Sequence, residues 1–305
     1  MARVPSPVAV VRRLPFPYRA PHVPRGVEPP PPRHVTGSRY DTEWARRYPA
    51  RLARLALLEG LARPTMKVLA APERRGLDRL DELTGPVIFA ANHHSHIDTP
   101  LMLTSIPEQW RHRIFVGAAA DYFFRNRATS AVSALVMGAI PIERSRVSRR
   151  SADQAAELIQ DGWSMLIFPE GGRSPDGWGQ PFRGGAAYLS IRCGVPVIPV
   201  HLRSTGRVLA KGDSVPRPAR TRVTFGTPIW PEEGEDARRL AARLEHTVAA
   251  LGDEARSDWW QARRRAHAGH TPGLTGPEVG TWRRAWARSD RRRRKTTDEP
   301  RWPDF

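Results

Sequence analysis

The sequence of 305 residues is poor in cysteine, in lysine and in long apolar runs. Its single cysteine, Cys193, excludes an internal disulfide and a cysteine-based metal cage, as is typical of a reducing compartment. The longest charge-free apolar run, residues 128–142, contains Pro141 and is shorter than the roughly 20 residues of a spanning helix. The four-residue apolar run before Arg12 is too short for a signal-peptide core. These shortages predict a cytoplasmic protein without a spanning helix.

Positive charge is abundant and concentrated toward the two ends of the chain. The net charge is +18, and residues 1–39 carry seven basic and one acidic residue, whereas residues 256–305 carry thirteen and six. Ten of the 30 prolines also lie in residues 1–39, which predicts a disordered Pro/Arg-rich tail. The C-terminal extension, residues 253–305, combines tryptophan with arginine clusters. That composition suits an anionic lipid surface, a nucleic acid or a solvated tail, and the sequence leaves these alternatives open.

Short apolar runs alternate with amphipathic stretches between the two tails. Strands are predicted at 86–91, 113–118, 139–142, 164–168, 196–202 and 222–225, and helices at 121–137, 149–161, 184–193 and around 240–251. This alternation predicts an α/β fold in which helices flank a largely parallel central sheet, with the main domain over residues 64–252.

An amphipathic helix is predicted ahead of that domain, within residues 40–63. Apolar residues recur at helical spacing in residues 42–62, and the helix is expected to end before Pro64. Its apolar side holds Trp44, Tyr48, Leu52 and Leu55, and its flank holds Arg47, Arg51 and Arg54. Such a helix can pack on the domain or lie on a membrane.

The segment after the first of the strands above, residues 92–98, contains a candidate general base. His93 and Asp98 are five positions apart, so they cannot share one face of a helix. We therefore expect His93 in a turn and Asp98 at the start of a helix. The carboxylate would fix the imidazole tautomer and make its other nitrogen a base, with the substrate's own hydroxyl as nucleophile.

Other interpretations of this segment stay open at this stage. Asp98 can be a plain helix cap and His93 a polar loop residue. A metal site of His93, His94, His96 and Asp98 is disfavoured, because adjacent positions in a short turn do not converge easily on one ion.

Residues 169–174, after the strand at 164–168, have the composition of an anion cradle. Gly171 and Gly172 let backbone N–H groups approach a ligand, and Arg173 can hold a phosphate with two parallel bonds. Glu170 can accept hydrogen bonds from a hydroxyl or an arginine. An ordinary tight turn explains the glycines equally well.

Four blocks of the sequence together resemble the glycerolipid acyltransferases. Asn-His-x4-Asp at 92–98, Gly-Ala-Ile-Pro-Ile-Glu-Arg at 138–144, Phe-Pro-Glu-Gly-Gly-Arg-Ser at 168–174 and Val-Pro-Val-Ile-Pro at 195–199 occur in that family's order and spacing. The sequence resembles bacterial-type 1-acylglycerol-3-phosphate acyltransferases over roughly residues 64–250. The fourth block also describes a buried strand, which we favour. Two positions depart from the family pattern, with Gly172 in place of threonine and Glu143 in place of aspartate.

The resemblance implies roles for the residues of these blocks. His93 would act as the base and Asp98 would orient it, while the acceptor phosphate would be held by Arg144, Glu170, Gly171, Gly172 and Arg173. The same resemblance implies a pocket bordered by Asn92, Ser95, Ser174, Phe182, Arg183 and Gly185.

The implied reaction needs two substrates and no bound cofactor or metal. The acyl donor would be acyl-CoA or acyl carrier protein, and the acceptor a lysophospholipid, first of all 1-acylglycerol 3-phosphate, which becomes phosphatidic acid. The amphipathic helix and basic tails would hold the protein on the inner face of the cell membrane. Two other hypotheses remain at this stage, a nucleic-acid-binding protein with charged tails and a catalytically silent lipid-binding scaffold.

Overall fold

The computed structural model describes residues 37, 40–142, 149–173, 178–210 and 213–275. A sheet of seven strands has the order β1-β7-β6-β2-β5-β3-β4. The strands are β1 (Glu73–Arg75), β2 (Ile88–Ala91), β3 (Ile114–Ala119), β4 (Ala139–Ile142), β5 (Ser164–Ile167), β6 (Val197–Arg203) and β7 (Arg222–Phe225). Neighbouring strands are parallel except for β6 and β7, which are antiparallel. The predicted α/β fold with a largely parallel sheet is confirmed, and β1 is a strand that the sequence did not reveal.

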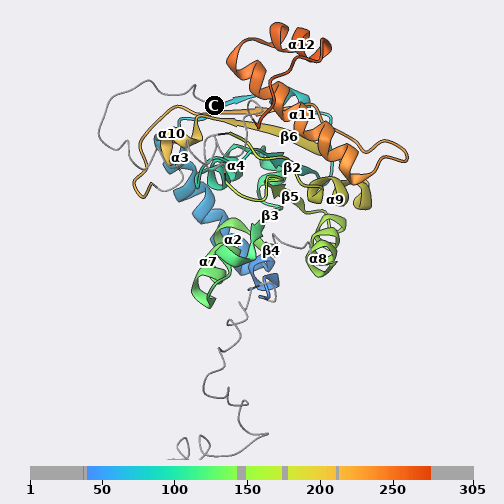
Figure 1. Ribbon diagram of the computed structural model, residues 1–305. Helices are drawn as coiled ribbons and strands as arrows, with labels where there is room; N and C mark the ends of the chain where they lie inside the picture. Colours follow the sequence, from blue (N-terminus) through green and yellow to red (C-terminus); the bar gives the residue numbers. More distant parts are fainter. Residues whose placement is uncertain (1–36, 38–39, 143–148, 174–177, 211–212, 276–305) are drawn as a thin grey trace, which may run out of the picture. The chain divides into compact units, whose positions relative to one another are not determined.

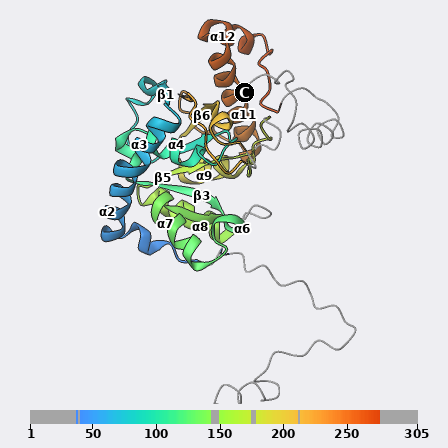
Figure 2. The ribbon, with the colours of Figure 1, turned by 90° about the vertical axis from the view of Figure 1, so that its left-hand side faces the viewer.

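The central strands are buried on both faces, as parallel strands covered by helices must be. Along β2 the side chains alternate, so Phe89 and Ala91 belong to one apolar cluster and Ile88 and Ala90 to another. Helices α3 (Arg63–Leu69), α4 (Asp98–Ser105) and α7 (Arg127–Met137) lie on one side of the sheet, and α8 (Arg149–Gln160), α9 (Gly185–Cys193) and α11 (Ala237–Arg256) on the other (Figures 1 and 2). The fourth sequence block lies in and before β6, whose first six residues are buried.

The N-terminal helix does not end before Pro64, contrary to the prediction. A 3-10 turn (Glu43–Arg46) precedes α2 (Tyr48–Leu57), and the helix then widens into a π turn (Leu58–Ala62) and continues as α3. The N–H of Arg63 donates to the carbonyl of Leu58, five residues back. Widening at this point accommodates the proline ring, which would otherwise clash with the carbonyl four residues before it.

The orientation of this helix also differs from the expected one. Arg54, predicted on the polar flank, is buried, whereas Tyr48 and Leu52 are 73% and 49% exposed. Two guanidinium nitrogens of Arg54 donate to backbone carbonyls of the sheet side, at Ile114 (2.8 Å) and Met137 (3.3 Å). Because those carbonyls accept from the arginine, the helix turns Arg54 inward and leaves part of its apolar stripe outside.

Two further predicted boundaries are wrong. The helix expected over 121–137 is two helices, α6 (Ala120–Phe123) and α7, because Asn126 forms a capping box with Thr129 and starts a new helix.

The domain end expected at residue 252 falls inside α11, and α12 (Trp259–His267) follows it. Arg265 of α12 forms a two-pronged ion pair with the buried Asp253 of α11, at 2.6 and 2.8 Å. The predicted tail at 1–39 lies almost entirely outside the described residues.

The buried His201 on β6 makes folding sensitive to acid. Its Nδ1 has no hydrogen-bond partner among the described residues, and a Cβ at Gly252 of α11 would lie 2.9 Å from its Nε2. Burial, with smaller effects from His94, Arg256 and Arg203, lowers the pKa of His201 to about 3. In the unfolded chain the same imidazole takes up a proton below a pH of about 6.5.

We expect His201→Leu to remove this part of the pH dependence. Between about pH 6.5 and 3 the unfolded state binds more protons, so the contribution of neutral His201 is complete above that window and is lost as the pH falls through it. From pH 7 to pH 5, urea unfolding should show wild type losing on the order of 2 kcal/mol relative to His201→Leu. The exposed His267→Leu should behave like wild type. Parallel pH profiles for wild type and His201→Leu would contradict the expectation.

Candidate functional site

Two of the sequence blocks meet because their strands are neighbours in the sheet. β2 and β5 pair in parallel, with Ala90 opposite Ile167. The segments that follow them therefore leave the same edge of the sheet side by side. Ligands of open α/β sheets collect at this edge, beyond the carboxyl ends of the strands.

His93 and Asp98 form the pair that the sequence predicts. His93 lies in the loop after β2 and Asp98 is the first residue of α4. Nδ1 of His93 lies 2.8 Å from Oδ2 of Asp98. The same Oδ2 accepts the backbone N–H groups of His94 (2.7 Å) and Ser95 (2.8 Å). One carboxylate oxygen thus holds both the imidazole and the backbone of its loop.

These contacts keep Asp98 charged although it is completely buried. Burial raises its pKa, but hydrogen bonds from His93 and Ser95 and the nearby His94 outweigh that effect, and the net pKa lies below the ordinary value. Its other oxygen, Oδ1, has no hydrogen-bond partner among the described residues. The negative charge is therefore directed at the imidazole and its loop.

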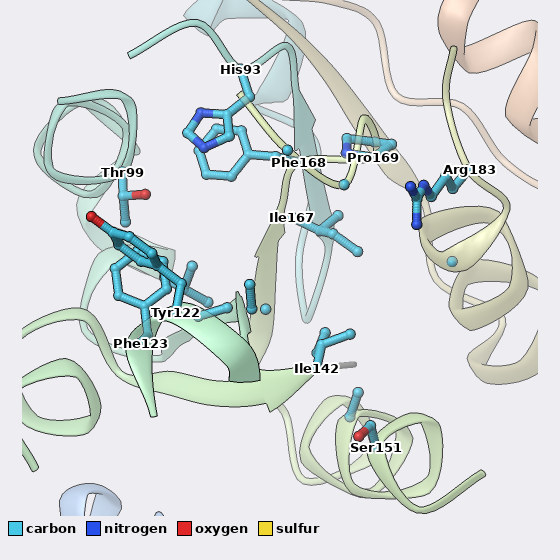
Figure 3. A pocket seen from close by; sticks show the side chains of 18 of the residues that line it. His93, Thr99, Tyr122, Phe123, Ile142, Ser151, Ile167, Phe168, Pro169 and Arg183 are labelled. Atoms are coloured by element: carbon cyan, nitrogen blue, oxygen red, sulfur yellow. The ribbon is translucent and has the colours of Figure 1, made fainter. Parts of the chain in front are cut away.

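The imidazole also stacks on an aromatic ring that directly follows the neighbouring strand, β5. His93 stacks on Phe168, with 4.2 Å between ring centroids and 19° between planes (Figure 3). Since Nδ1 contacts Asp98, Nε2 is the ring nitrogen that does not face Asp98 and can accept a proton. The ring is oriented by a carboxylate at its edge and a phenyl group on its face.

Glu170 has a different place from the one that the resemblance implied. Its side chain is buried and accepts the backbone N–H of His93 at 2.8 Å and that of Gln180 at 2.9 Å. It therefore fastens the loop after β2 to the loop after β5 and does not line the cavity beside them. Burial raises the pKa of Glu170 to about 8, although the two N–H bonds oppose the shift. Near neutral pH the two carboxyl groups differ, with Asp98 charged and Glu170 largely protonated.

A cavity of about 340 Å³ opens beside His93. Its wall is mostly apolar, from β3, the end of β4, α6 and α8, and the sticks in Figure 3 show Ile142 and Ser151 at the end away from His93. Residues that line it include His93, His96, Thr99, Gly117, Tyr122, Met137, Ile142, Ala155, Phe168, Arg173 and Arg183. An apolar chamber with an imidazole and two guanidinium groups at its wall suits an amphiphile with an anionic head group.

The turn after β5 depends on glycine at one position. Gly171 has φ +70°, and a Cβ there would lie 2.8 Å from Nε of Arg183. Any other residue would therefore be strained and would displace that guanidinium. At Gly172, by contrast, an added Cβ would meet nothing within 4 Å, so the absence of the family's threonine leaves space in the cavity wall.

The structure places the other predicted site residues in three groups. Gly171, Gly172, Arg173, Arg183 and Gly185 line the cavity. Asn92 and Ser95 are buried instead, bonding the backbone of Leu202 (2.9 and 2.6 Å) and of Leu209 (2.6 Å), and Phe182 packs with Leu274. Glu143, Arg144 and Ser174 lie outside the described residues.

Several cavity residues were not predicted for catalysis or phosphate binding, and His96 was considered only in the disfavoured metal site. His96 stacks with Tyr122 at 5.9 Å between ring centroids. Burial and the nearby Arg173 lower the pKa of His96. Thr99 and Tyr122 also line the cavity, but one hydroxyl in a helix and one aromatic in an apolar stretch carry no sequence signal. Among the described residues no group of three or more His, Cys, Asp or Glu side chains is placed to hold a metal ion.

Comparison with known proteins finds the same resemblance to acyltransferases as the four sequence blocks. Residues 71–203 match the family described as Acyltransferase. The chain is 28% identical over 178 residues to the chloroplastic 1-acyl-sn-glycerol-3-phosphate acyltransferase BAT2 of Brassica napus, covering 57% of this chain and 49% of that protein. It is 29% identical over 139 residues to the human 1-acyl-sn-glycerol-3-phosphate acyltransferase beta, covering 42% and 45%. The chain thus spans about half the length of these curated relatives.

A solved structure shares the fold. The crystal structure of the 1-acyl-sn-glycerophosphate (LPA) acyltransferase PlsC from Thermotoga maritima superposes with a TM-score of 0.54, covering 72% of this chain and 84% of that one at 22% identity. The segment that matches the family, residues 71–203, contains β2, the His93–Asp98 pair, β5 and the turn at Gly171. Residues 71–203, less than half of the chain, thus resemble the family described as Acyltransferase, and the similar proteins named above are 1-acyl-sn-glycerol-3-phosphate or 1-acyl-sn-glycerophosphate acyltransferases.

Proposed function

We propose that this protein transfers an acyl group from the thioester of acyl-CoA or acyl carrier protein to the free hydroxyl of a lysophospholipid. The preferred acceptor in this proposal is 1-acylglycerol 3-phosphate, and the product is phosphatidic acid. The observation that carries the proposal is the Asp98-held imidazole at the wall of an apolar cavity that also presents Arg173 and Arg183.

In the proposed mechanism Nε2 of His93 removes the proton of the acceptor hydroxyl as its oxygen attacks the thioester carbon. Asp98 stabilises the imidazolium that forms. The tetrahedral intermediate then collapses, the carbon–sulfur bond breaks, and the imidazolium returns the proton to the departing sulfur. Arg173 and Arg183 hold the acceptor phosphate, and the apolar wall accommodates an acyl chain.

We expect His93→Ala and Asp98→Asn each to lower acyl transfer by about 10²- to 10⁴-fold. The first removes the base, and the second leaves a single amide oxygen for three donors and a neutral partner for the imidazolium. The assay is thiol release from acyl-CoA with 1-acylglycerol 3-phosphate, and a panel of other lysolipids distinguishes the acceptor. Activity that survives both substitutions would refute the mechanism.

Glu170→Ala tests whether fastening the two loops matters for catalysis. The substitution leaves the N–H groups of His93 and Gln180 without their acceptor, so we expect at least tenfold less thiol release and a loss of about 1–3 kcal/mol in unfolding free energy. Glu235→Ala is the matched control, since Glu235 is also buried but bonds Glu232 and Arg243, outside the cavity lining. If both variants lose stability and neither loses activity, Glu170 contributes to folding alone.

We also propose that the protein works as a peripheral protein on the cytoplasmic face of the cell membrane. No helix in the described ranges is long and apolar enough to cross a bilayer. The helix from α2 to α3 nevertheless presents large apolar side chains to solvent, among them Leu61 (63% exposed) and Val68 (73%). Exposed side chains of this kind can insert at a lipid surface.

Val68→Glu should reduce cosedimentation with vesicles that contain anionic lipid by several-fold, because it places a charge where an apolar group would enter the bilayer. Val215→Glu is the control, since Val215 is equally exposed (72%) and lies outside this helix. Equal losses for the two variants would show that charge anywhere on the surface is responsible. Unchanged binding of Val68→Glu would argue against this helix as the anchor.

A further inference from the structure

A second cavity lies away from the catalytic one, beside α2 and α5 (Glu108–Arg111). Its volume is about 160 Å³, and its described lining has no residue in common with that of the catalytic cavity. We call it the α2 groove. Its cationic residues are Arg51, Arg54 and Arg111, and its exposed apolar residues are Tyr48, Leu52 and Leu55. No acidic side chain is among the described residues that line it.

Arg54 brings a buried charge to the groove that no carboxylate in the described part of the chain neutralises. Its Nη atoms donate to the carbonyls of Ile114 and Met137, and its Nε has no hydrogen-bond partner among the described residues. Burial, together with the like charge of Arg51, lowers the pKa of Arg54 to about 10, so it stays protonated at neutral pH. Backbone carbonyls satisfy hydrogen bonds but carry only partial charge, so an anion nearby would be stabilised.

Arg51 lies three residues before Arg54 and is only half-buried. Its guanidinium lies 5.5 Å from the ring centroid of Trp163, and it forms no ion pair with any described residue. Arg111, the third cation of the groove, pairs with Glu59 at 2.9 Å, and Glu59 is also shared by Arg63 (2.7 Å) and His112 (3.5 Å). The positive charge of the groove therefore exceeds the negative charge of Glu59.

The apolar half of the lining indicates what kind of anion fits. Tyr48, Leu52 and Leu55 are 73%, 49% and 43% exposed, so they offer a chain-binding surface next to the two arginines. A free phosphate would leave that surface in water, whereas an acyl chain would cover it. We propose that the α2 groove binds an anionic phospholipid, with its phosphate at Arg51 in the field of Arg54 and an acyl chain over Leu52 and Leu55.

This site is independent of acyl transfer and can be tested by photolabelling of the full chain. The probe is dihexanoyl phosphatidic acid with a diazirine on one chain, used as a monomer below its micelle concentration. Labelled peptides are mapped by mass spectrometry after digestion with a protease that does not cut at arginine. We expect label in the peptide that contains Leu52 and Leu55, separately from any label in the catalytic cavity.

Arg51→Gln should reduce the α2 label about tenfold, which corresponds to about 1.4 kcal/mol of binding free energy, and should leave label in the catalytic cavity unchanged, because the substitution removes the charged donor to the phosphate. Arg47→Gln is the matched control, because Arg47 lies one turn earlier, is exposed and pairs with Glu43. It should keep both labels. His93→Ala should also keep the α2 label, which separates this proposal from the proposed reaction.

Competition decides the class of ligand. Unlabelled dihexanoyl phosphatidic acid should displace the probe from the α2 groove, and neither dihexanoyl phosphatidylcholine nor millimolar inorganic phosphate should match it. Equal competition by the phosphatidylcholine would reduce the groove to an apolar patch, and equal competition by inorganic phosphate would make it a simple anion site. Either result, absence of α2 label, or unchanged label in Arg51→Gln would overturn the proposal.

Discussion

The organisation of the site depends on one buried oxygen atom, Oδ2 of Asp98. It lies 2.8 Å from Nδ1 of His93 and accepts hydrogen bonds from two backbone N–H groups of the same loop. Donors that converge on one carboxylate oxygen orient the imidazole and fold the loop at the same time. The same bonds keep the carboxylate ionised in a place where burial alone would favour its neutral form.

Glu170 shows how a second carboxyl group can sit close to this charge. Both groups are buried and both accept backbone N–H groups, but Asp98 also faces an imidazole, and Glu170 does not. Burial dominates at Glu170 and raises its pKa to about 8, and the neighbouring Asp98 adds to that shift. A largely neutral Glu170 can hold the two loops together without competing with Asp98 for the positive charge on His93.

The two cavities differ in the groups that neutralise their positively charged side chains. In the cavity beside His93, the imidazole has a carboxylate partner and the guanidinium groups lie at an apolar wall. In the α2 groove, Arg54 is buried against carbonyls only, and Arg51 stands beside it without an ion pair in the described ranges. The first arrangement suits proton transfer, because the charge on the base can be stabilised as it forms. The second suits retention of an anion.

The sequence by itself determined the parallel strands, whose apolar runs can be satisfied only by burial on both faces, and the pairing of His93 with Asp98, which is local and follows from their spacing. It did not determine the helix through Pro64, the inward turn of Arg54 or the role of Glu170. Those depend on partners distant in the chain, such as the carbonyl of Ile114 or the N–H of His93, that only the folded structure brings near. Local sequence patterns indicate which groups must be buried or paired, whereas tertiary packing decides which distant residue each of them contacts.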